Sequence, residues 1–200
     1  MAAEQPGPMQ LQPIGGAPIY QRGKMHDFPL ATKRATVEKY GLGFVVGLAP
    51  QEPDPGWVQL HEEGALRYVL APIPDGQIVG NALGFLWLLA AAVTRQAKPA
   101  GLGVLGHCAG GRNRSGLFNA LMLREWTGCS GAEAVAIVKA ARPTALENEE
   151  FVAWLSALPA VGEAGQVARI LPTEIGPACD PTQQELFGAD QEGGAEDATT

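Results

Sequence analysis

The sequence predicts an α/β fold with a central, mostly parallel β-sheet flanked by helices. Short apolar runs alternate with longer segments of helical periodicity, which is the pattern of consecutive strand–helix–strand units. Three of these runs are almost continuously apolar, as expected of strands that are buried on both faces. Of the 200 residues, 46% are hydrophobic. This is enough for the core of one domain of roughly 150 residues, with terminal segments outside it.

The first predicted element is a short strand over 19–25, whose partly alternating sequence IYQRGKM is typical of an edge strand. Helix-forming residues follow over 30–41, and Gly41 can serve as the C-cap. The apolar run GFVVGLA over 43–49 then predicts a strand buried on both faces. Together these segments form the first strand–helix–strand unit of the sheet.

A cluster of turn residues, QEPDPG over 51–56, separates this unit from the next one. We expect a short helix over 57–65 and a second buried strand over 66–73, which ends at the turn Pro-Asp-Gly over 74–76. The next predicted helix, over 78–96, contains an apolar stretch of about twelve residues, whereas a membrane span needs about 20. We therefore interpret it as a buried core helix.

The third buried strand, LGVLGHC over 102–108, leads into a glycine-rich loop. Apolar residues at helical spacing then predict a helix over 114–126. The capping-box pattern Ser-Gly-Ala-Glu begins another helix over 130–141. The last amphipathic helix is expected over 148–158, and we expect the last three helices to pack together.

The two ends of the chain differ from this body in composition and charge. Residues 1–17 are rich in Pro, Gly and Gln, so we expect a flexible segment that does not pack. The body, 18–162, is predicted to be a single domain. The formal net charge of the chain is −7, and the six acidic residues after position 179 have no basic partner there. Residues 163–200 are therefore predicted to form an acidic, disordered tail.

Composition argues against several classes of protein. A net charge of −7 does not fit a general nucleic-acid binder, which would present a basic surface. Cys108, Cys129 and Cys179 form an odd, widely spaced set that suits neither a disulfide framework nor a zinc site. The sequence begins without a signal-peptide pattern. We therefore expect a cytoplasmic protein with no membrane span, no metal or other cofactor and no nucleic-acid partner.

The segment VLGHCAGGRNRSG, over 104–116, has the pattern of a phosphate site. It places Cys108 at the carboxyl end of a buried strand, where α/β proteins bind ligands, and Arg114 at the start of a helix. Free N–H groups at a helix N-terminus bind anions, and Gly110 and Gly111 allow further backbone N–H groups to turn inward. Arg114 adds a permanently charged fork that fits phosphate oxygens.

A cysteine in such a position has a chemical role. The donors that bind a phosphate also stabilise a thiolate on Cys108. A thiolate at the bottom of a phosphate site is a nucleophile for phosphorus. Ser115, at the start of the helix, can donate its hydroxyl to that thiolate and assist its departure. Arg112 can bring a second positive charge to the mouth of the site.

The sequence HCAGGRNRS resembles the signature loop of the cysteine-based protein tyrosine phosphatase superfamily, and the short chain is most similar to its dual-specificity branch. The resemblance covers about residues 18–160, because PIPDG and RPTALENEEFVAWL also stand where atypical members of that branch have similar stretches. It implies a phosphocysteine intermediate on Cys108, a loop oriented by His107 and a general acid on a separate upstream loop. The resemblance also implies that the phosphate is bound by the loop residues Ala109, Gly110, Gly111, Arg112, Asn113 and Arg114.

We assign the general acid to Asp75, which lies 33 residues before Cys108 and directly after a predicted strand. A carboxyl group there can donate a proton to the leaving oxygen and then activate water. Aspartate in Pro-Asp-Gly is also a common turn residue, so a purely structural role stays open. Asp54, in another turn flanked by prolines, is the weaker candidate.

Three functions remain open at this point. The first is hydrolysis of phosphotyrosine and of phosphoserine or phosphothreonine in proteins, since no insertion that would deepen the pocket is evident. The second is the same chemistry on a non-protein phosphate: the NRSG stretch also resembles the loop of RNA 5′-triphosphatases, and Arg112 would favour a phosphoinositide. The third is a phosphate-binding module without catalysis. A rhodanese-like sulfurtransferase would also have a cysteine in a loop that leads into a helix. The oligomeric state is not predicted.

Several other residues are predicted to have structural roles. His26 and His61 have no partner at a recognisable spacing, so we expect them on the surface or on a helix face, and Cys129 has the context of a small packed thiol. Asn148 is expected to connect helices near the loop. The tryptophans are expected in the core (Trp57, Trp87, Trp126 and Trp154).

Overall fold

The computed structural model describes residues 7–23, 25–49, 53–76 and 80–162. The chain divides into two compact units, Met1–Ala168 and Arg169–Thr200, and all of the described residues belong to the first. The fold below is therefore that of the first unit. The acidic tail predicted over 163–200 falls outside the described residues and stays a prediction.

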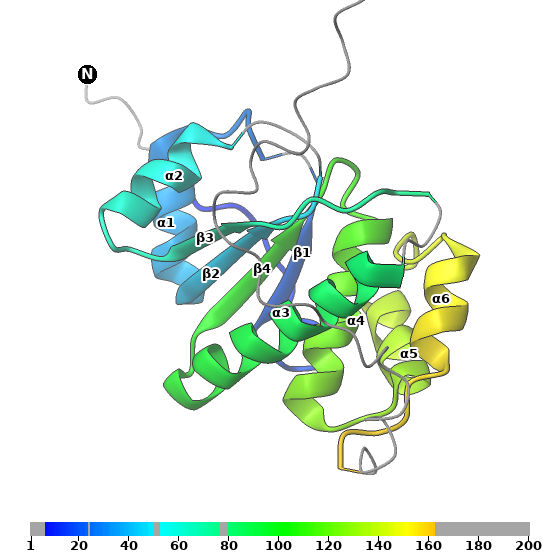
Figure 1. Cartoon of the computed structure of the whole chain (residues 1–200). Helices are drawn as coiled ribbons and strands as arrows, with labels where there is room; N and C mark the ends of the chain where they lie inside the picture. Colours follow the sequence, from blue (N-terminus) through cyan, green and yellow to red (C-terminus); the bar gives the residue numbers. More distant parts are fainter. Residues whose placement is uncertain (1–6, 24, 50–52, 77–79, 163–200) are drawn as a thin grey trace, which may run out of the picture. The chain divides into compact units, whose positions relative to one another are not determined.

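Four parallel strands form the central sheet, in the order β1-β4-β2-β3 (Figure 1). The strands are β1 (Ile19–Arg22), β2 (Leu42–Gly47), β3 (Arg67–Leu70) and β4 (Gly103–His107). Because all four run the same way, their carboxyl ends lie along one edge of the sheet. The predicted α/β class and its parallel sheet are confirmed, and the first strand lies at an edge as expected.

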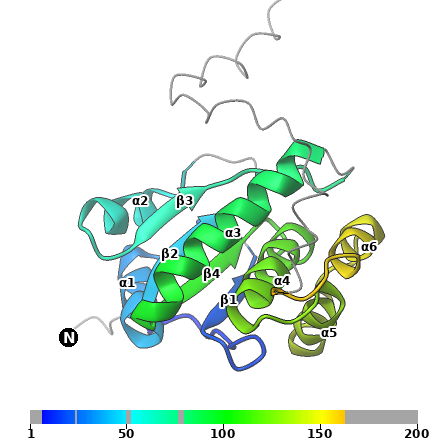
Figure 2. The same cartoon turned by 60° about the horizontal axis from the view of Figure 1, so that its bottom comes forward.

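Helices cover both faces of this sheet (Figure 2). Tyr20, Val45 and Leu105 pack with α1 and α2 on one face, whereas their strand neighbours pack with α3 and α4 on the other. This alternation along each strand makes two hydrophobic clusters, one per face. The helices are α1 (Leu30–Tyr40), α2 (Pro55–Glu62), α3 (Gly80–Ala100), α4 (Asn113–Thr127), α5 (Gly131–Ala141) and α6 (Glu149–Ser156).

Local signals set several of the helix ends. Gly41 follows α1 in the left-handed conformation, with φ of 57°, as predicted for a C-cap. Ser130 and Glu133 form the predicted capping box at the start of α5. By contrast, α2 begins inside the predicted turn, because the Asp54 carboxylate accepts hydrogen bonds from the N–H groups of Gly56 and Trp57 and proline suits the first helical position.

The strand predicted over 66–73 is present as β3, but the prediction that it is buried on both faces is wrong. β3 is an edge strand that pairs only with β2, and two of its residues, Arg67 and Leu70, are exposed. Its apolar sequence resembled that of a central strand, but burial depends on the order of strands in the sheet. That order is set by contacts between distant segments and leaves no periodic signal in the strand itself.

The N-terminal segment packs where the sequence predicted that it would not. The side chains of Met9, Leu11 and Ile14 are buried and join the two hydrophobic clusters. The Met9 N–H donates to Thr36 Oγ1 at 2.8 Å, and the Leu11 N–H donates to the Tyr40 hydroxyl at 3.0 Å. The expectation of an unpacked segment is therefore wrong for residues 9–17. Single apolar residues between Pro, Gly and Gln gave no periodicity from which to predict this.

The long helix α3 is buried on one face only. Leu86 and Ala90 lie in the core, whereas Phe85 is 54% exposed and Leu88 is 50% exposed. The interpretation as a fully buried core helix is therefore too strong. None of the helices in the described part of the chain is both long and apolar enough to cross a membrane.

Candidate active site

The loop over 108–114 lies at the carboxyl end of β4 and leads directly into α4. Cys108 follows the strand and is buried. Gly111 has a φ of 63°, and a Cβ atom there would lie 2.2 Å from the backbone nitrogen of Gly23, at the end of β1. No other residue type fits this turn without moving backbone, so the loop is packed tightly against the first strand.

The nucleophile candidate and its predicted hydroxyl partner meet in this loop. The sulfur of Cys108 lies 3.4 Å from the Ser115 hydroxyl oxygen, and both side chains are buried. Ser115 stands in the first turn of α4, so its position relative to the sulfur is set by the helix. The hydroxyl is within hydrogen-bond reach of a thiolate on Cys108.

Arg114 and Asp75 also meet, although they come from different parts of the chain. The guanidinium of Arg114 lies 3.3 Å from a carboxylate oxygen of Asp75. The Arg114 side chain is almost fully buried, whereas that of Asp75 is 46% exposed. The buried guanidinium of Arg114 is suited to bind an anion such as a phosphate. The exposed carboxyl group of Asp75 is suited to exchange a proton with the group to which that phosphate is attached.

Cys108 and Asp75 line a hollow of about 230 Å³. Arg112 and Glu147 stand at its rim as an ion pair, with 3.1 Å between nitrogen and oxygen, and both side chains are about half exposed. Sequence reasoning missed Glu147, which carries no motif of its own. The residues that line the hollow are Asp75, Cys108, Gly110, Arg112, Asn113 and Glu147.

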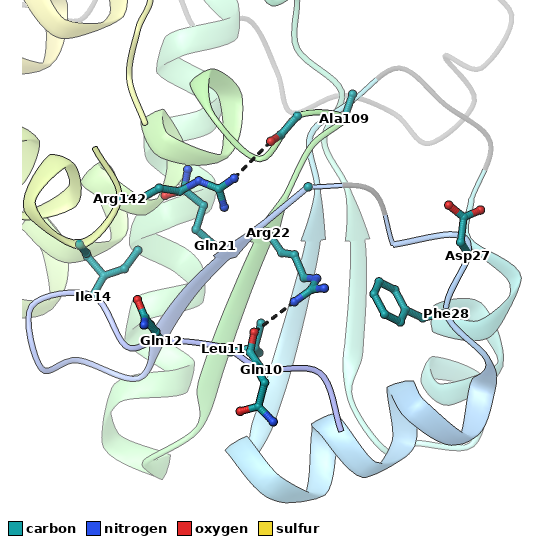
Figure 3. A pocket seen from close by; sticks show the side chains of 13 residues that line it. Gln10, Leu11, Gln12, Ile14, Gln21, Arg22, Asp27, Phe28, Ala109 and Arg142 are labelled. Atoms are coloured by element: carbon teal, nitrogen blue, oxygen red, sulfur yellow. Dashed lines mark hydrogen bonds between the residues drawn. The ribbon is translucent and has the colours of Figure 1, made fainter. Parts of the chain in front are cut away.

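Gln21, in β1, supports the loop from below and was also missed. Figure 3 shows Gln21 on this strand. Its side-chain amide donates to the carbonyl oxygens of Gly111 at 2.9 Å and of Arg112 at 3.2 Å. Holding two successive carbonyl groups outward leaves the N–H groups of the loop free to face an anion. Gln21 lies 90 residues before Gly111, so no local pattern connects the two.

Asn148, predicted to connect helices near the loop, also reaches the loop of the candidate acid. Its backbone N–H donates to Asn113 Oδ1 at 3.0 Å, and its side-chain amide donates to the Gly76 carbonyl at 3.1 Å. The start of α6 thereby connects the first residue of α4 with the residue after Asp75. These bonds hold the carboxylate and the cysteine loop at a fixed separation.

Solved structures of phosphatases share this architecture. Human DUSP28 superposes with a TM-score of 0.59 at 24% identity, covering 80% of this chain and 99% of that one. A mutant form of Tk-PTP gives 0.56 at 22% identity, covering 80% and 97%. The core catalytic domain of the PP-IP phosphatase SIW14 from S. cerevisiae gives 0.53 at 16% identity, covering 84% and 98%.

The chain has the dual-specificity phosphatase fold. No model of a protein family matches the sequence, and no curated protein matches it. The fold is thus evident from the arrangement of the chain rather than from overall sequence similarity.

In this dual-specificity phosphatase fold, His107 is the last residue of β4 and is buried directly before the loop. Its ring is stacked on that of Tyr68, with centroids 6.3 Å apart and planes 11° from parallel. Neither ring nitrogen has a hydrogen-bond partner among the described residues. Burial lowers the pKa of His107 to about 4, with Lys33 and His26 contributing in the same direction and Asp54 opposing them. The ring is therefore neutral near pH 7.

This gives the folded protein a predictable sensitivity to acid. The unfolded chain protonates His107 below its ordinary pKa of about 6.5, whereas the folded chain does so only near 4, so the free energy of unfolding falls as the pH falls between these values. We expect wild type to lose about 2 kcal/mol more than His107→Phe between pH 7 and pH 4.5. Urea titrations at both pH values measure the difference. Equal losses in the two proteins would contradict it.

Asp54, the weaker acid candidate, lies elsewhere. It is fully buried at the start of α2, where it pairs with Lys33 and has His26 Nδ1 at 3.6 Å from its second oxygen. It does not line the hollow beside Cys108. His26 lies on the surface, as expected, and the fold brings it to Asp54, which lies 28 residues later in the sequence. His61 lies on the exposed surface of α2 and shares a hydrogen bond with the Leu66 carbonyl oxygen.

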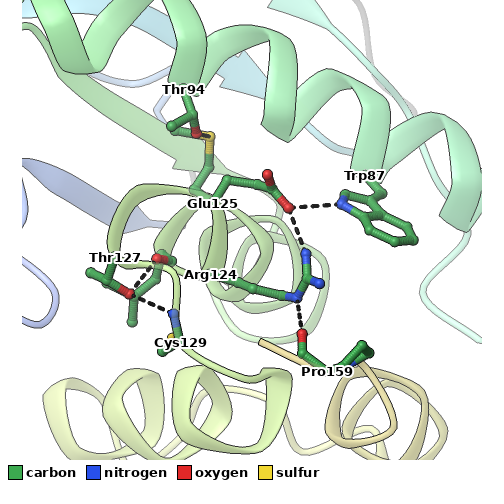
Figure 4. Close-up of polar contacts among 9 residues, drawn as sticks. Trp87, Thr94, Arg124, Glu125, Thr127, Cys129 and Pro159 are labelled. Atoms are coloured by element: carbon green, nitrogen blue, oxygen red, sulfur yellow. Dashed lines mark hydrogen bonds and ion pairs between the residues drawn. The ribbon is translucent and has the colours of Figure 1, made fainter. Parts of the chain in front are cut away.

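α4, which carries the second half of the loop, is anchored at its far end. The buried Arg124 guanidinium binds Glu125 at 2.6 Å and the Pro159 carbonyl oxygen at 2.9 Å, and it lies over the ring of Trp87 from α3 (Figure 4). The Trp87 ring N–H donates to the same Glu125 oxygen at 2.9 Å. The contacts fix α4 between α3 and the segment after α6, and the last three helices pack together as predicted.

Proposed function

We propose that this protein is a phosphomonoester hydrolase that uses Cys108 as its nucleophile and acts on phosphorylated tyrosine, serine or threonine in proteins. The observation that carries the proposal is the joint position of three groups. Cys108 and Asp75 line one small hollow, and the buried Arg114 guanidinium lies 3.3 Å from the Asp75 carboxylate. The fold shared with solved phosphatases supports the same reaction class.

The first step is transfer of the phosphoryl group to sulfur. The Cys108 thiolate attacks phosphorus, an S–P bond forms and the bond from phosphorus to the leaving oxygen breaks. The Asp75 carboxyl donates its proton to that oxygen, so the leaving group departs as a neutral alcohol or phenol. Arg114 and the N–H groups of the loop bind the nonbridging oxygens, where negative charge is concentrated in the transition state.

The second step returns the enzyme to its starting state. A water molecule attacks the phosphocysteine, the S–P bond breaks and inorganic phosphate forms. Asp75, now a carboxylate, accepts the proton that the water loses. The Ser115 hydroxyl, 3.4 Å from the sulfur, donates a hydrogen bond to the departing thiolate. The cycle consumes one water and requires no group outside the chain.

The size of the hollow supports a substrate whose phosphate stands on an exposed side chain. At about 230 Å³, with half-exposed Arg112 and Glu147 at its rim, it admits a phosphate and the start of its carrier from solvent. A second candidate substrate is a phosphorylated inositol. The likeness to SIW14, whose name specifies PP-IP phosphatase activity, and the cationic Arg112 at the rim favour it.

The test of the proposed function is turnover of p-nitrophenyl phosphate by the full chain in buffer that contains EDTA. We expect steady release of p-nitrophenol that EDTA does not reduce. A comparison of phosphotyrosine, phosphothreonine, phosphoinositide and RNA 5′-triphosphate substrates then ranks the substrate classes. Binding of tungstate without turnover would instead indicate a phosphate-binding module, and transfer of sulfur from thiosulfate would indicate a sulfurtransferase.

A further inference from the structure

The ion pair at the rim of the hollow joins two segments that are far apart in the chain. Arg112 belongs to the cysteine loop, whereas Glu147 directly precedes the start of α6, and both side chains line the hollow. The other carboxylate among the described lining residues is Asp75, which faces Arg114. Each of the two arginines therefore has one carboxylate within ion-pairing distance.

The backbone on both sides of Glu147 is hydrogen-bonded to the cysteine loop and the start of α4. The Leu146 N–H donates to the Arg112 carbonyl oxygen at 3.4 Å, and the Asn148 N–H donates to Asn113 Oδ1 at 3.0 Å. Glu147 stands between these two hydrogen bonds, so its backbone is held beside Arg112 by contacts other than the ion pair. Less conformational entropy is then lost when the pair forms than in a pair between two mobile surface side chains.

Leu146 adopts a backbone conformation that leucine rarely takes. Its φ is 55°, the single positive value among the non-glycine residues that the structure describes. Its side chain is buried against α4, where a Cβ atom added to Gly116 would lie 3.1 Å from Leu146 Cγ. A left-handed backbone costs free energy in leucine, and such residues persist where the surrounding structure holds them. Here the strained residue comes directly before Glu147, which the chain then presents at the rim.

The pair sets the charge that a substrate meets beside the reacting phosphate. In the proposed reaction, Arg114 binds that phosphate, so Arg112 is the remaining cation of the rim. A guanidinium fork fits phosphate oxygens, and a free Arg112 would attract a second phosphate on a neighbouring atom of the substrate. With Glu147 in place, a second phosphate has to displace the carboxylate and then lie close to its negative charge. A substrate with one phosphate needs no such exchange.

We infer that Glu147 restricts the site to substrates with a single phosphate, because its ion pair with Arg112 disfavours a second phosphate on an adjacent carbon atom. The inference rests on the proposed function, which it narrows to phosphorylated side chains of proteins and away from inositols with neighbouring phosphates. Glu147 acts through Arg112 and contacts no reacting atom, so it is a positioning residue.

The test compares two competitive inhibitors of p-nitrophenyl phosphate turnover by the full chain. One is an inositol monophosphate, and the other is the bisphosphate that differs from it by a phosphate on the adjacent ring carbon. The readout is the inhibition constant of the monophosphate divided by that of the bisphosphate. For wild type we expect a ratio of about 2, because either phosphate can occupy the site but the second one gains no cation. For Glu147→Gln we expect about 10, since Arg112 is then free to bind the second phosphate.

Further variants assign the effect to the pair. Arg112→Gln should keep the ratio near that of wild type, and adding Glu147→Gln to it should cause no rise, because the two residues act as a unit. Glu147→Asp keeps the charge, so its ratio should stay below that of the Gln variant. The rise in Glu147→Gln should shrink as salt is added, because Arg112 is half exposed.

Glu62→Gln is the matched control. Glu62 is exposed on α2 and does not line the hollow, so the same change of net charge there should leave the ratio as in wild type. Both inhibition constants are measured on one protein, and a smaller folded fraction lowers the rate without changing their ratio. A loss of folding therefore does not imitate the expected result.

The outcomes separate this inference from the proposed function. A ratio near that of Glu147→Gln already in wild type, no rise in Glu147→Gln, or an equal rise in Glu62→Gln would overturn the inference, while turnover of p-nitrophenyl phosphate leaves the proposed function standing. A rise that persists without Arg112 would overturn the positioning role. If p-nitrophenyl phosphate is not hydrolysed, the proposed function fails, and calorimetry with the two inositol phosphates still measures the same ratio.

Discussion

Cys108→Ser abolishes the hydrolysis of p-nitrophenyl phosphate, with an expected fall in kcat of about 10⁴-fold or more. A serine hydroxyl at this position stays protonated, because the loop donors that stabilise a thiolate do not suffice to ionise an alcohol, and no histidine is among the described residues that line the hollow. The change removes the nucleophile but leaves Arg114 and the backbone N–H groups in place. Steady-state kinetics measures the loss, and titration calorimetry with tungstate should still give a dissociation constant within a few-fold of wild type.

Cys129→Ser is the matched control for this experiment. Cys129 is the other free cysteine among the described residues, and it is half-buried after α4, away from the hollow. The same chemical change there should leave kcat within about twofold, since ordinary substitutions outside special sites act within fractions of a kcal/mol. Residual turnover in the Cys108 variant, or an equal loss in the Cys129 variant, would contradict the assignment of the nucleophile.

Asp75→Asn should lower kcat in a way that depends on the leaving group. A p-nitrophenolate departs readily without a proton, so its rate should fall by less than about tenfold. An alkyl phosphate such as phosphothreonine needs the proton, so its rate should fall by about 10²- to 10³-fold. The substitution removes a negative charge 3.3 Å from Arg114, so KM should stay constant or decrease. A plot of log kcat against leaving-group pKa measures the effect.

Glu147→Gln distinguishes proton donation from a general effect of charge at the rim. Glu147 is the second carboxylate of the hollow, and it faces Arg112 rather than Arg114. Its neutralisation should change the rates of good and poor leaving groups by the same factor, leaving the slope of the plot as in wild type. If the Asp75 variant also keeps that slope, Asp75 is not the general acid.

The features that could be predicted from the sequence are those formed by residues that lie a few positions apart in the chain. The phosphate loop is contiguous from His107 to Ser115, and the caps at Gly41 and Ser130 each depend on neighbours three or four positions away. Because such features depend on contacts between residues close in sequence, a local sequence pattern is sufficient to predict them. The α/β class follows for the same reason, since each strand–helix unit is local.

The features that were missed depend on segments far apart in the chain. Gln21 supports a loop 90 residues away, and Glu147 reaches the rim through its contact with Arg112, 35 residues earlier. β3 was placed in the interior because its composition, unlike its position in the strand order, matches that of β2. The burial of Met9 and Leu11 likewise depends on α1, with which they pack. None of these contacts produces a periodic pattern in the sequence from which it could be predicted.

The strand order β1-β4-β2-β3 has a consequence for how the protein folds during synthesis. In the sheet of the described residues β1 pairs with β4 alone, and β4 begins at Gly103, so the first strand to be synthesised cannot enter the sheet until the last one has been made. Contacts across such long sequence separations form slowly. Until they form, Gln21 and Gly23 cannot support the loop, and the unpaired edge of β4 is open to other chains. Pairing of the first strand with the last strand and assembly of the phosphate loop are therefore expected to occur together, late in folding.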